Sequence, residues 1–308
     1  MAKRTASLII AVALAHASGA VAQTPPPAAA LQNPSPMVET TRAHERFTRA
    51  RLKGAIRSFA GPAGKPVEVF VPDDARARDT VQLVIHFHGD AWVPHQAAAQ
   101  LAPLTAVAVV NLGAGSGLYH HTFAHPAVFD SLLAAIGREM AAVTGKTSRV
   151  ARLTLTGFSA GHGAIRAILR DPRHFAAVDG VLLLDGMHTS YIPERTVLEA
   201  GGALDTTNLT VFAELARAAV RGEKRFLVTH SEIFPGTFAS TTETADWLLR
   251  AVGLRRTPVL HWGPRGMQQL SESRAGRFEL LGFAGNTGPD HVDHLHAMPE
   301  MLARVVAP

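Results

Sequence analysis

A serine in the segment 157–161 (GFSAG) directly follows a β-type apolar run and directly precedes a helical pattern. A serine hydroxyl attacks a carbonyl only when a nearby base takes its proton, so a catalytic serine has to stand exposed in a tight turn. Gly157 and Gly161 permit that turn, because larger side chains two positions from the serine would clash. A serine that only caps a helix needs no flanking glycines. The pattern predicts Ser159 as the nucleophile of an acyl-transfer reaction, and the following helix favours the developing negative charge.

A second group of polar residues follows an earlier buried strand pattern, at His86, His88, Gly89 and Asp90. Acyl transfer requires amide donors for the oxygen that becomes negative, and the residue after the nucleophile supplies one of them. Gly89 lets the backbone approach a substrate closely. We therefore expect the amides of Gly89 and Asp90, together with that of Ala160, to form the oxyanion hole. For the two histidines, a structural role with hydrogen bonds to the backbone is an equally good interpretation.

Three histidines near the C-terminus compete for the role of general base: His291, His294 and His296. They follow a pattern rich in glycine, asparagine and proline at 282–289, and an apolar helical pattern comes after them. A base must come within hydrogen-bond reach of the serine, which a loop residue does more easily than a helical one. We expect His291 to lie in the loop and to be the base, with His294 as the alternative. His294 and His296 are expected in the first turn of the final helix.

These residues lie between short buried strand patterns and amphipathic helical patterns. Apolar and β-branched runs predict strands at 67–71, 81–87, 106–111, 152–156, 180–184, 226–230 and 277–283. Helical periodicity predicts helices at 126–144, 207–221 and 242–252. Strands that alternate with helices in this way predict an α/β fold, with a mostly parallel central sheet and helices on both of its faces.

Over about residues 60–303 this arrangement resembles the α/β-hydrolase superfamily. The resemblance rests on His88 and Gly89 after one strand, on the segment 157–161 after the next strand but one, and on a histidine just before the last helix. It implies the α/β-hydrolase fold and a serine hydrolase of the esterase or lipase kind, with no cofactor. The superfamily shares the chain order nucleophile, acid and then histidine, which implies an acid between the serine and the histidine.

Two carboxylates could serve as that acid. The commonest pattern of the superfamily places it a few residues after the strand expected at 226–230, where this chain has Phe234. Glu232 lies just beyond that strand, whereas Asp185 follows the strand expected at 180–184, as in a minority of lipases of the superfamily. A carboxylate that closes an apolar strand is costly to bury without a partner, and a protonated histidine would be one. We favour Asp185, with Glu232 as the alternative and a turn or helix cap as the competing structural role of Asp185.

Two other classes of function compete with a serine hydrolase. His86, His88 and Asp90 match the start of a H-x-H-x-D-H metal motif, and with the cluster 291–296 they could hold zinc in a metallohydrolase. That motif needs a histidine where the chain has Ala91, and the GFSAG turn would then have no role. The other alternative is a periplasmic binding protein without catalysis, because a fold alone does not guarantee an activity.

The segment 113–125 (GAGSGLYHHTFAH) follows the strand expected at 106–111, at the same sheet edge as the serine. We expect a loop that borders the substrate pocket, with Tyr119 as one wall and Trp92 as another. An ordinary surface loop with a packed tyrosine is the competing interpretation. The expected partner of the site is a small-molecule or polymeric ester, with an amide as the less favoured substrate.

The N-terminus has the layout of a secretory signal, because two basic residues precede a short apolar run and a small-x-small site. The apolar run is shorter than the about 20 residues that span a bilayer, which disfavours a retained anchor. We expect a secreted or periplasmic protein without stable membrane insertion. The expected division is a signal peptide at 1–22, a disordered spacer rich in proline and alanine at 23–40, and an α/β-hydrolase domain at 41–308.

Composition narrows the remaining functions. Hydrophobic residues make up 47% of the chain, which excludes a disordered protein. The formal charge is +5 and the basic residues are scattered, so the sequence does not indicate a nucleic-acid partner. The chain has no cysteine, which excludes disulfides, thiol catalysis and cysteine-ligated metals. None of these patterns indicates an oligomeric state.

Overall fold

The computed structural model of the protein describes residues 44–101 and 104–307. The expected signal peptide at 1–22 and the expected spacer at 23–40 lie outside the described residues, so both stay predictions. Within the described ranges, no helix has the length and apolar character needed to cross a membrane.

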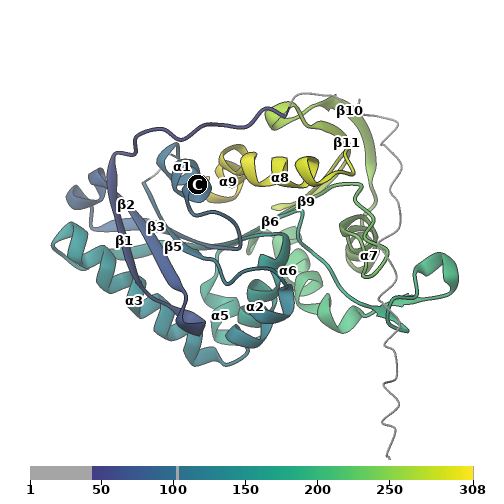
Figure 1. Ribbon diagram of the computed structural model, residues 1–308, viewed down its shortest axis with the longest axis horizontal. Coiled ribbons are helices and arrows are strands. Elements are labelled where there is room, and N and C mark those ends of the chain that lie inside the picture. The colour runs from purple at the N-terminus through teal and green to yellow at the C-terminus, as the bar shows by residue number, and fades with distance from the viewer. Residues whose placement is uncertain (1–43, 102–103, 308) are drawn as a thin grey trace, which may run out of the picture.

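One large sheet runs through the protein (Figure 1). Six neighbouring strands in it are parallel, and antiparallel strands extend it at both edges. Its central strands are apolar because both of their faces are covered. Among the described residues the sheet has ten strands, in the spatial order β1 (Gly54–Ala60), β2 (Pro66–Pro72), β4 (Thr105–Val110), β3 (Thr80–Phe87), β5 (Arg149–Phe158), β6 (Gly180–Leu184), β9 (Arg225–His230), β12 (Phe278–Phe283), β11 (Gln268–Ala275) and β10 (Thr257–Trp262).

Helices cover both faces of this sheet and enclose one buried apolar cluster on each side (Figure 1). One face carries α1 (Trp92–Ala99), α8 (Gly288–His296) and α9 (Met298–Val306). The other face carries α2 (Ser116–Phe123), α3 (Pro126–Thr144), α4 (His162–Leu169), α5 (Pro172–Ala177), α6 (Thr210–Val220) and α7 (Thr241–Val252). The predicted fold class, a mostly parallel sheet with helices on both faces, is confirmed.

Every strand and helix expected from periodicity is present within a few residues of its expected bounds. The sequence patterns did not predict α1, α5, β1, the β11–β10 hairpin or a small second sheet of β7 (Tyr191–Ile192) and β8 (Ala203–Leu204). The hairpin was not predicted because most of its residues are exposed or half-buried, so its sequence lacks apolar alternation.

The carboxyl ends of the parallel strands meet at one edge of the sheet. Phe158, the last residue of β5, lies opposite Leu184, the last residue of β6. Ser159 and Asp185 therefore begin neighbouring turns. β12 is parallel to this group, so the helix that follows it, α8, starts at the same edge.

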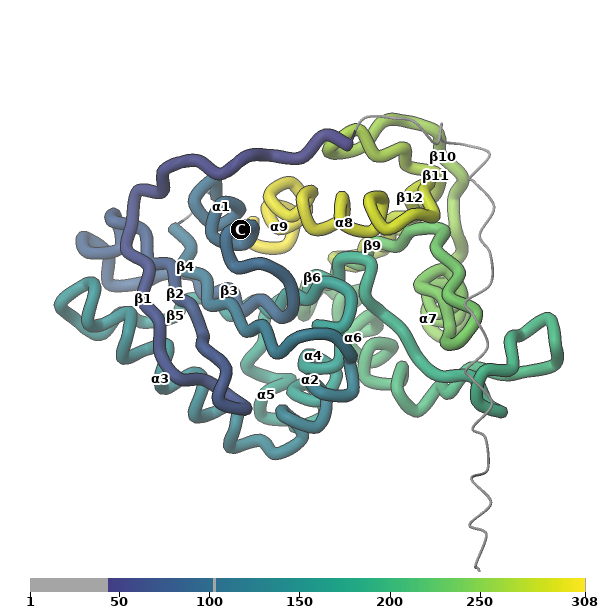
Figure 2. Tube along the Cα trace, viewed as in Figure 1, coloured from purple at the N-terminus to yellow at the C-terminus, as the bar shows by residue number. Residues whose placement is uncertain are grey.

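The stretch that precedes β1 passes over α1 and α8, which are distant from it in sequence (Figure 2). Nε of Arg46 lies 3.1 Å from Oδ1 of Asp293 on α8. The ring of Phe47 has its centroid 5.2 Å from that of Trp92 and 5.1 Å from that of His296. This stretch therefore ties the helix that bears the candidate base to the segment after β3.

Candidate active site

Ser159 stands in a sharp turn between β5 and α4. Its φ is 47°, in the left-handed region that residues other than glycine seldom adopt. A Cβ atom on Gly161 would lie 2.1 Å from the carbonyl oxygen of Phe87, and one on Gly157 would lie 3.0 Å from the carbonyl carbon of Gly161. Close backbone packing therefore requires glycine on both sides of the serine, as the sequence pattern predicts.

Two further glycines let neighbouring segments pack against this turn. A Cβ atom on Gly186 would lie 2.5 Å from the carbonyl oxygen of Ser159 and 2.7 Å from its amide nitrogen. A Cβ atom on Gly163 would lie 2.1 Å from the carbonyl oxygen of Ser116, at the start of α2. The turn after β6 and the first turn of α2 therefore enclose the serine turn from two sides.

Asp185 is buried at the end of β6 and is held by several hydrogen bonds. Its Oδ1 accepts from the amide of Ser231 at 2.9 Å and from the hydroxyl of Thr241 at 2.6 Å. Its Oδ2 accepts from the hydroxyl of Ser231 at 2.7 Å and lies 2.7 Å from Nδ1 of His291. Burial by itself would raise the pKa of Asp185, but the imidazoles of His294 and His291 and the hydroxyl of Thr241 hold it well below its usual range. The carboxylate is therefore ionised at neutral pH and fixed in direction.

His291 reaches this carboxylate from α8. A hydrogen bond donated by its Nδ1 to Asp185 leaves Nε2 of the neutral ring as a proton acceptor. The imidazole also packs on Phe158, the residue before Ser159, with ring centroids 4.5 Å apart. The structure therefore brings the favoured acid and the favoured base together beside the serine turn.

The expectation that His291 lies in a loop is wrong, because α8 begins earlier than the sequence indicates. The hydroxyl of Thr287 accepts from the amide of Asp290 at 3.4 Å, and Oδ2 of Asp290 accepts from the amide of Thr287 at 2.9 Å. This reciprocal cap, together with Pro289 in the first turn, starts the helix at Gly288. A first-turn residue can still reach the site, since the N-terminus of α8 lies at the carboxyl edge of the sheet.

The alternative base and the alternative acid have other partners. His294 is almost fully buried, and its Nδ1 lies 2.8 Å from the hydroxyl of Thr229. Burial lowers the pKa of His294, so its ring is neutral. Oε2 of Glu232 accepts from the amide of Gly285 at 3.1 Å.

The segment after β3 bends sharply toward the serine turn. The φ angles of His88 and Gly89 are 72° and 113°, so two successive residues adopt left-handed or related conformations. His86 supports this bend, because its Nε2 donates to the carbonyl of His88 at 2.7 Å and its Nδ1 accepts from the hydroxyl of Thr156 at 2.8 Å. Burial lowers the pKa of His86 to about 3, which keeps the ring neutral. Both ring nitrogens of His86 are engaged, which leaves neither available for the alternative zinc site.

The expected oxyanion donors lie in the two turns at this edge. Gly89 is close to the serine turn, since a Cβ atom on it would lie 3.8 Å from the ring of Phe158. Asp90 follows with its side chain exposed, and its Oδ1 accepts from the amide of Trp92 at 3.4 Å. Ala160 borders the cavity beside the serine. The role of the amides of Gly89, Asp90 and Ala160 in an oxyanion hole stays a prediction.

A cavity of about 600 Å³ opens beside Ser159. Residues from α4, from the start of α2 and from the segments after β6 and β9 line it: Gly115, Ser116, Gly117, Ala160, His162, Arg166, His188, Thr189, Ser190, Asn208 and Phe238. Most of the lining residues have polar side chains, although apolar atoms make up more of the lining surface than polar atoms do. Ala160 and the start of the segment 113–125 were expected here, whereas the other lining residues were not predicted. One signal for them was present in the sequence, because Arg166 interrupts the otherwise apolar helical pattern after the serine.

The segment 113–125 borders this cavity only at its start, and most of it is helix α2 rather than a loop. Tyr119 is fully buried. Its hydroxyl accepts from the amide of Leu112 at 3.0 Å and lies 3.2 Å from Nδ1 of His88. The prediction of Tyr119 as a pocket wall is wrong, because the ring fills the core and its hydroxyl has partners there.

Trp92 does not line the cavity either. Its ring packs against Phe47 and lies 5.6 Å from the ring of His296, and the guanidinium of Arg49 lies 5.2 Å from its centroid. The prediction of a second wall at Trp92 is therefore wrong. This indole instead joins α1 to the N-terminal stretch and to α8.

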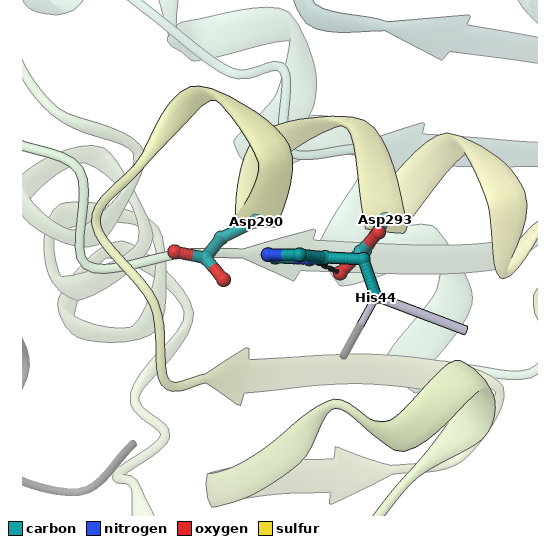
Figure 3. Close-up of side chains that lie close together, drawn as sticks. All are labelled: His44, Asp290 and Asp293. Carbon is teal, nitrogen blue, oxygen red and sulfur yellow. Dashed lines mark hydrogen bonds and ion pairs between the residues drawn. The ribbon is translucent and has the colours of Figure 1, made fainter. Parts of the chain in front are cut away.

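One cluster near the site could offer three metal ligands: His44, Asp290 and Asp293, whose ligand atoms lie within 4.8 Å of one another. Figure 3 shows His44 between the two carboxylates of α8. Nδ1 of His44 lies 2.5 Å from Oδ2 of Asp293, and Arg46 binds the other oxygen of Asp293. Asp290 accepts from Thr287 in the helix cap. These hydrogen bonds and ion pairs account for the cluster, which fastens the N-terminal stretch to α8.

Comparison with known proteins gives similarity in structure but not in sequence. No family model matches the chain, and no curated protein matches it. An ester hydrolase from the metagenome of Lake Arreo is 16% identical, with 84% of each chain covered and a TM-score of 0.45. A siderophore hydrolase from Aspergillus nidulans is 12% identical, with 84% of this chain and 94% of that chain covered and a TM-score of 0.46. A fungal esterase from Rhizomucor miehei is 12% identical, with 82% and 83% covered and a TM-score of 0.44.

The chain has the α/β-hydrolase fold. At such low identity, this assignment rests on the chain's own architecture. The parallel strands, the helices on both faces and the strand–turn–helix geometry at Ser159 together form the arrangement expected of that fold.

Proposed function

We propose that the protein is a serine hydrolase that cleaves an ester, with an amide as the less favoured substrate, through an acyl-enzyme on Ser159. The observation that carries the proposal is the pairing of the buried Asp185 with the half-buried His291, beside a serine held at a φ of 47°. A nucleophile in a strained turn, next to an oriented base, is the arrangement that such chemistry uses. The esterases and hydrolases of similar fold agree with this class of reaction.

In the proposed mechanism, Oγ of Ser159 attacks the ester carbonyl carbon while Nε2 of His291 accepts the hydroxyl proton. The carbonyl oxygen becomes negative and is held by the amides of Ala160 and of Gly89 or Asp90. The tetrahedral intermediate expels the alcohol, which takes the proton from His291, and an acyl-serine remains. A water molecule then gives a proton to Nε2 and attacks the acyl-serine. The second tetrahedral intermediate expels Oγ of Ser159, which takes the proton back from Nε2, and the carboxylic acid is released.

The experiment that tests this proposal combines a labelled fluorophosphonate with a short-chain aryl ester. We expect the probe to label the wild-type protein and not Ser159→Ala, and we expect the variant to lose nearly all turnover, since a nucleophile–base pair contributes on the order of 10⁶-fold. A variant that kept the wild-type rate would overturn the proposal. Metal analysis of the same samples distinguishes the alternatives: bound zinc with no labelling supports the metallohydrolase, and neither zinc nor labelling supports the non-catalytic binding protein.

We further propose that the protein acts outside the cytoplasm, as a secreted or periplasmic enzyme without stable membrane insertion. The N-terminal pattern of the sequence supports this location. N-terminal sequencing of protein exported by a bacterial host should begin at Gln23. Recovery of an intact N-terminus from the cytoplasmic fraction would contradict it.

A further inference from the structure

The cavity beside Ser159 contains a buried cation. Arg166 on α4 is 7% exposed and lines this cavity. Its Nε is buried and has no hydrogen-bond partner in the part of the chain that the structure describes. A buried charge is costly unless a group of opposite charge binds it. An arginine with an unpaired buried nitrogen at the wall of a cavity therefore indicates that a ligand supplies the missing partner.

Arg166 has one acidic neighbour among the residues that the structure describes, Asp205, whose carboxylate forms its hydrogen bonds with other residues. Burial and, to a smaller extent, the charge of Arg170 lower the pKa of Arg166 to about 10 against the opposing effect of Asp205, so the guanidinium stays charged at neutral pH. The carboxylate of Asp205 already accepts from the amide of Thr207 at 3.1 Å and from the side-chain amide of Asn208 at 2.9 Å. Arg170 is exposed, and its guanidinium donates a hydrogen bond to the carbonyl oxygen of Thr207.

The histidines in the cavity wall add no second charge. Burial lowers the pKa of His162 to about 3 and also lowers that of His188, so both rings are neutral at pH 7. His162 donates from Nδ1 to the carbonyl of Ser159 at 2.9 Å, and His188 donates from Nδ1 to the carbonyl of Ala239 at 3.0 Å. Among the lining residues, the cavity therefore presents one positive charge, which matches a ligand group with one negative charge.

The position of Arg166 relative to the nucleophile sets the length of that ligand. Ser159 precedes α4, which begins at His162, and Arg166 lies four residues, or about 6 Å along the axis, after that first residue. Side chains of a helix lean toward its N-terminus, so the guanidinium lies nearer to the serine than its Cα does. A spacer of a few carbon atoms can then join the reacting carbonyl to the anion.

We propose that Arg166 binds a free carboxylate of the substrate, so that the enzyme prefers esters that carry a carboxylate a few carbon atoms from the ester group. This inference rests on the proposed function of Ser159. A planar carboxylate fits a guanidinium with two parallel hydrogen bonds, whereas a phosphate dianion would exceed the single positive charge of the cavity. A long aliphatic chain would meet only one large apolar side chain in the lining, that of Phe238.

Two pairs of substrates test this proposal with the full-length mature protein. Monoethyl adipate against ethyl hexanoate places the carboxylate on the acyl side, and 4-acetoxybutanoate against butyl acetate places it on the alcohol side. We expect kcat/KM for the charged ester to exceed that for its neutral partner by about 10- to 100-fold in at least one pair, the range of a charge-assisted hydrogen-bonded pair. Arg166→Gln should bring this ratio close to one. Arg170→Gln, which removes a neighbouring exposed charge, should keep it.

Inhibition of the wild-type protein gives a second measurement that needs no variant. Adipate should inhibit hydrolysis of a neutral aryl ester at least about 10-fold more strongly than adipamide, its neutral diamide, does. Ser159-dependent hydrolysis with no preference for either charged ester and no stronger inhibition by adipate would overturn the role of Arg166 and leave the proposed function standing. An equal fall of the ratio in both arginine variants would also overturn it, because the effect would then be a general one of charge. Absence of serine labelling and of all ester hydrolysis would instead contradict the proposed function itself.

Discussion

Oδ2 of Asp185 lies 2.7 Å from Nδ1 of His291, although 106 positions separate the two residues in the chain. The carboxylate belongs to the turn directly after β6, the strand beside the one that bears Ser159. The amide and hydroxyl of Ser231 and the hydroxyl of Thr241 fix its direction. The acid is therefore oriented before any substrate arrives, and its partner histidine is held in one tautomer.

The first prediction concerns this acid. Asp185→Asn should lower kcat by about 10⁴-fold with little change in KM, because the histidine loses its orientation and the stabilisation of its cation. Glu232→Gln is the matched control, since Glu232 binds the amide of Gly285 instead. Steady-state kinetics of both variants decides the assignment. A large loss in Glu232→Gln with near-normal Asp185→Asn would reverse it.

The second prediction separates the two histidines of α8. His291→Gln should lose nearly all turnover, because no other group would accept the serine proton. His294→Gln should keep kcat within about 10-fold and mainly lower the thermal midpoint, since it loses a buried hydrogen bond to Thr229. Pre-steady-state acylation and thermal unfolding measure the two effects. Equal loss of acylation in the two variants would contradict the assignment of the base.

The third prediction concerns Gly186, which packs against the backbone of the nucleophile. Gly186→Ala should abolish turnover or prevent folding, because the added methyl group would lie 2.5 Å from the carbonyl oxygen of Ser159. Gly137→Ala is the control, because its Cβ atom would meet nothing within 4 Å in the middle of α3. That control should keep full activity and gain about 0.5–1 kcal/mol of stability. Normal kinetics of Gly186→Ala would contradict the close packing of Gly186 against the backbone of Ser159.

The fourth prediction is acid destabilisation by buried neutral histidines. Burial lowers the pKa of His86 and of His162 to about 3 and that of His95 to about 4, from an ordinary value of 6.5. The unfolded chain therefore binds more protons than the folded protein below pH 6.5, and stability falls as the pH drops from 6.5 toward these values. Each such histidine contributes a slope of about 1.4 kcal/mol per pH unit within its window.

Urea unfolding at a series of pH values measures this slope. His95→Gln should reduce it by about 1.4 kcal/mol per pH unit between pH 6 and pH 4, while the comparison at pH 8 isolates the cost of altered packing. His95 is buried on α1, away from the serine turn, so the variant reports on stability alone. An unchanged slope in the variant would show that His95 is protonated in the folded protein.

The fifth prediction concerns the N-terminal stretch. Arg46→Ala should lower stability by about 1–2 kcal/mol and speed hydrogen exchange in α8, because the fully buried carboxylate of Asp293 loses an ion pair. A several-fold fall in kcat should accompany this change, since α8 positions His291. Arg57→Ala is the control: its exposed pair with Glu139 should contribute less than about 1 kcal/mol and leave the exchange of α8 unaltered. Equal exchange of α8 in both variants would contradict the role of the stretch.

The turn at Ser159 could be anticipated from local patterns, and Asp185 and His291 were favoured over Glu232 and His294. Ser159 and Asp185 each directly follow a strand whose apolar pattern is clear, and parallel strands bring their carboxyl ends to one edge. The start of α8 was not anticipated, because a cap at Thr287 begins the helix within a pattern rich in glycine. The positions of Tyr119 and Trp92 could not be anticipated in this way. Whether an aromatic ring fills the core or faces a cavity depends on which helix packs over it, and that packing joins segments distant in sequence.

Most residues that line the cavity were not predicted, for the same reason. Arg166 lies on α4, whose other side chains are mostly apolar. Periodicity in the sequence places this residue on a helix but does not show which part of the protein its side chain faces. His188 and Phe238 enter the wall from irregular segments, which carry no periodic signal. The sequence signal for this cavity is Arg166 itself, a charged residue within an apolar helical pattern, seven residues after the expected nucleophile.

The location of Asp185 directly after β6 has a consequence for how the proposed hydrolase can diversify. Ser231 and Thr241 both bind Asp185, so the chain between β9 and α7 is anchored to the acid at its two ends. Phe238 stands between these anchors and forms part of the cavity wall. Residues between Ser231 and Thr241 can be exchanged, and this segment can be lengthened, without moving the carboxylate of Asp185. We therefore expect substrate preference to be adjustable in this interval at little cost to the catalytic groups.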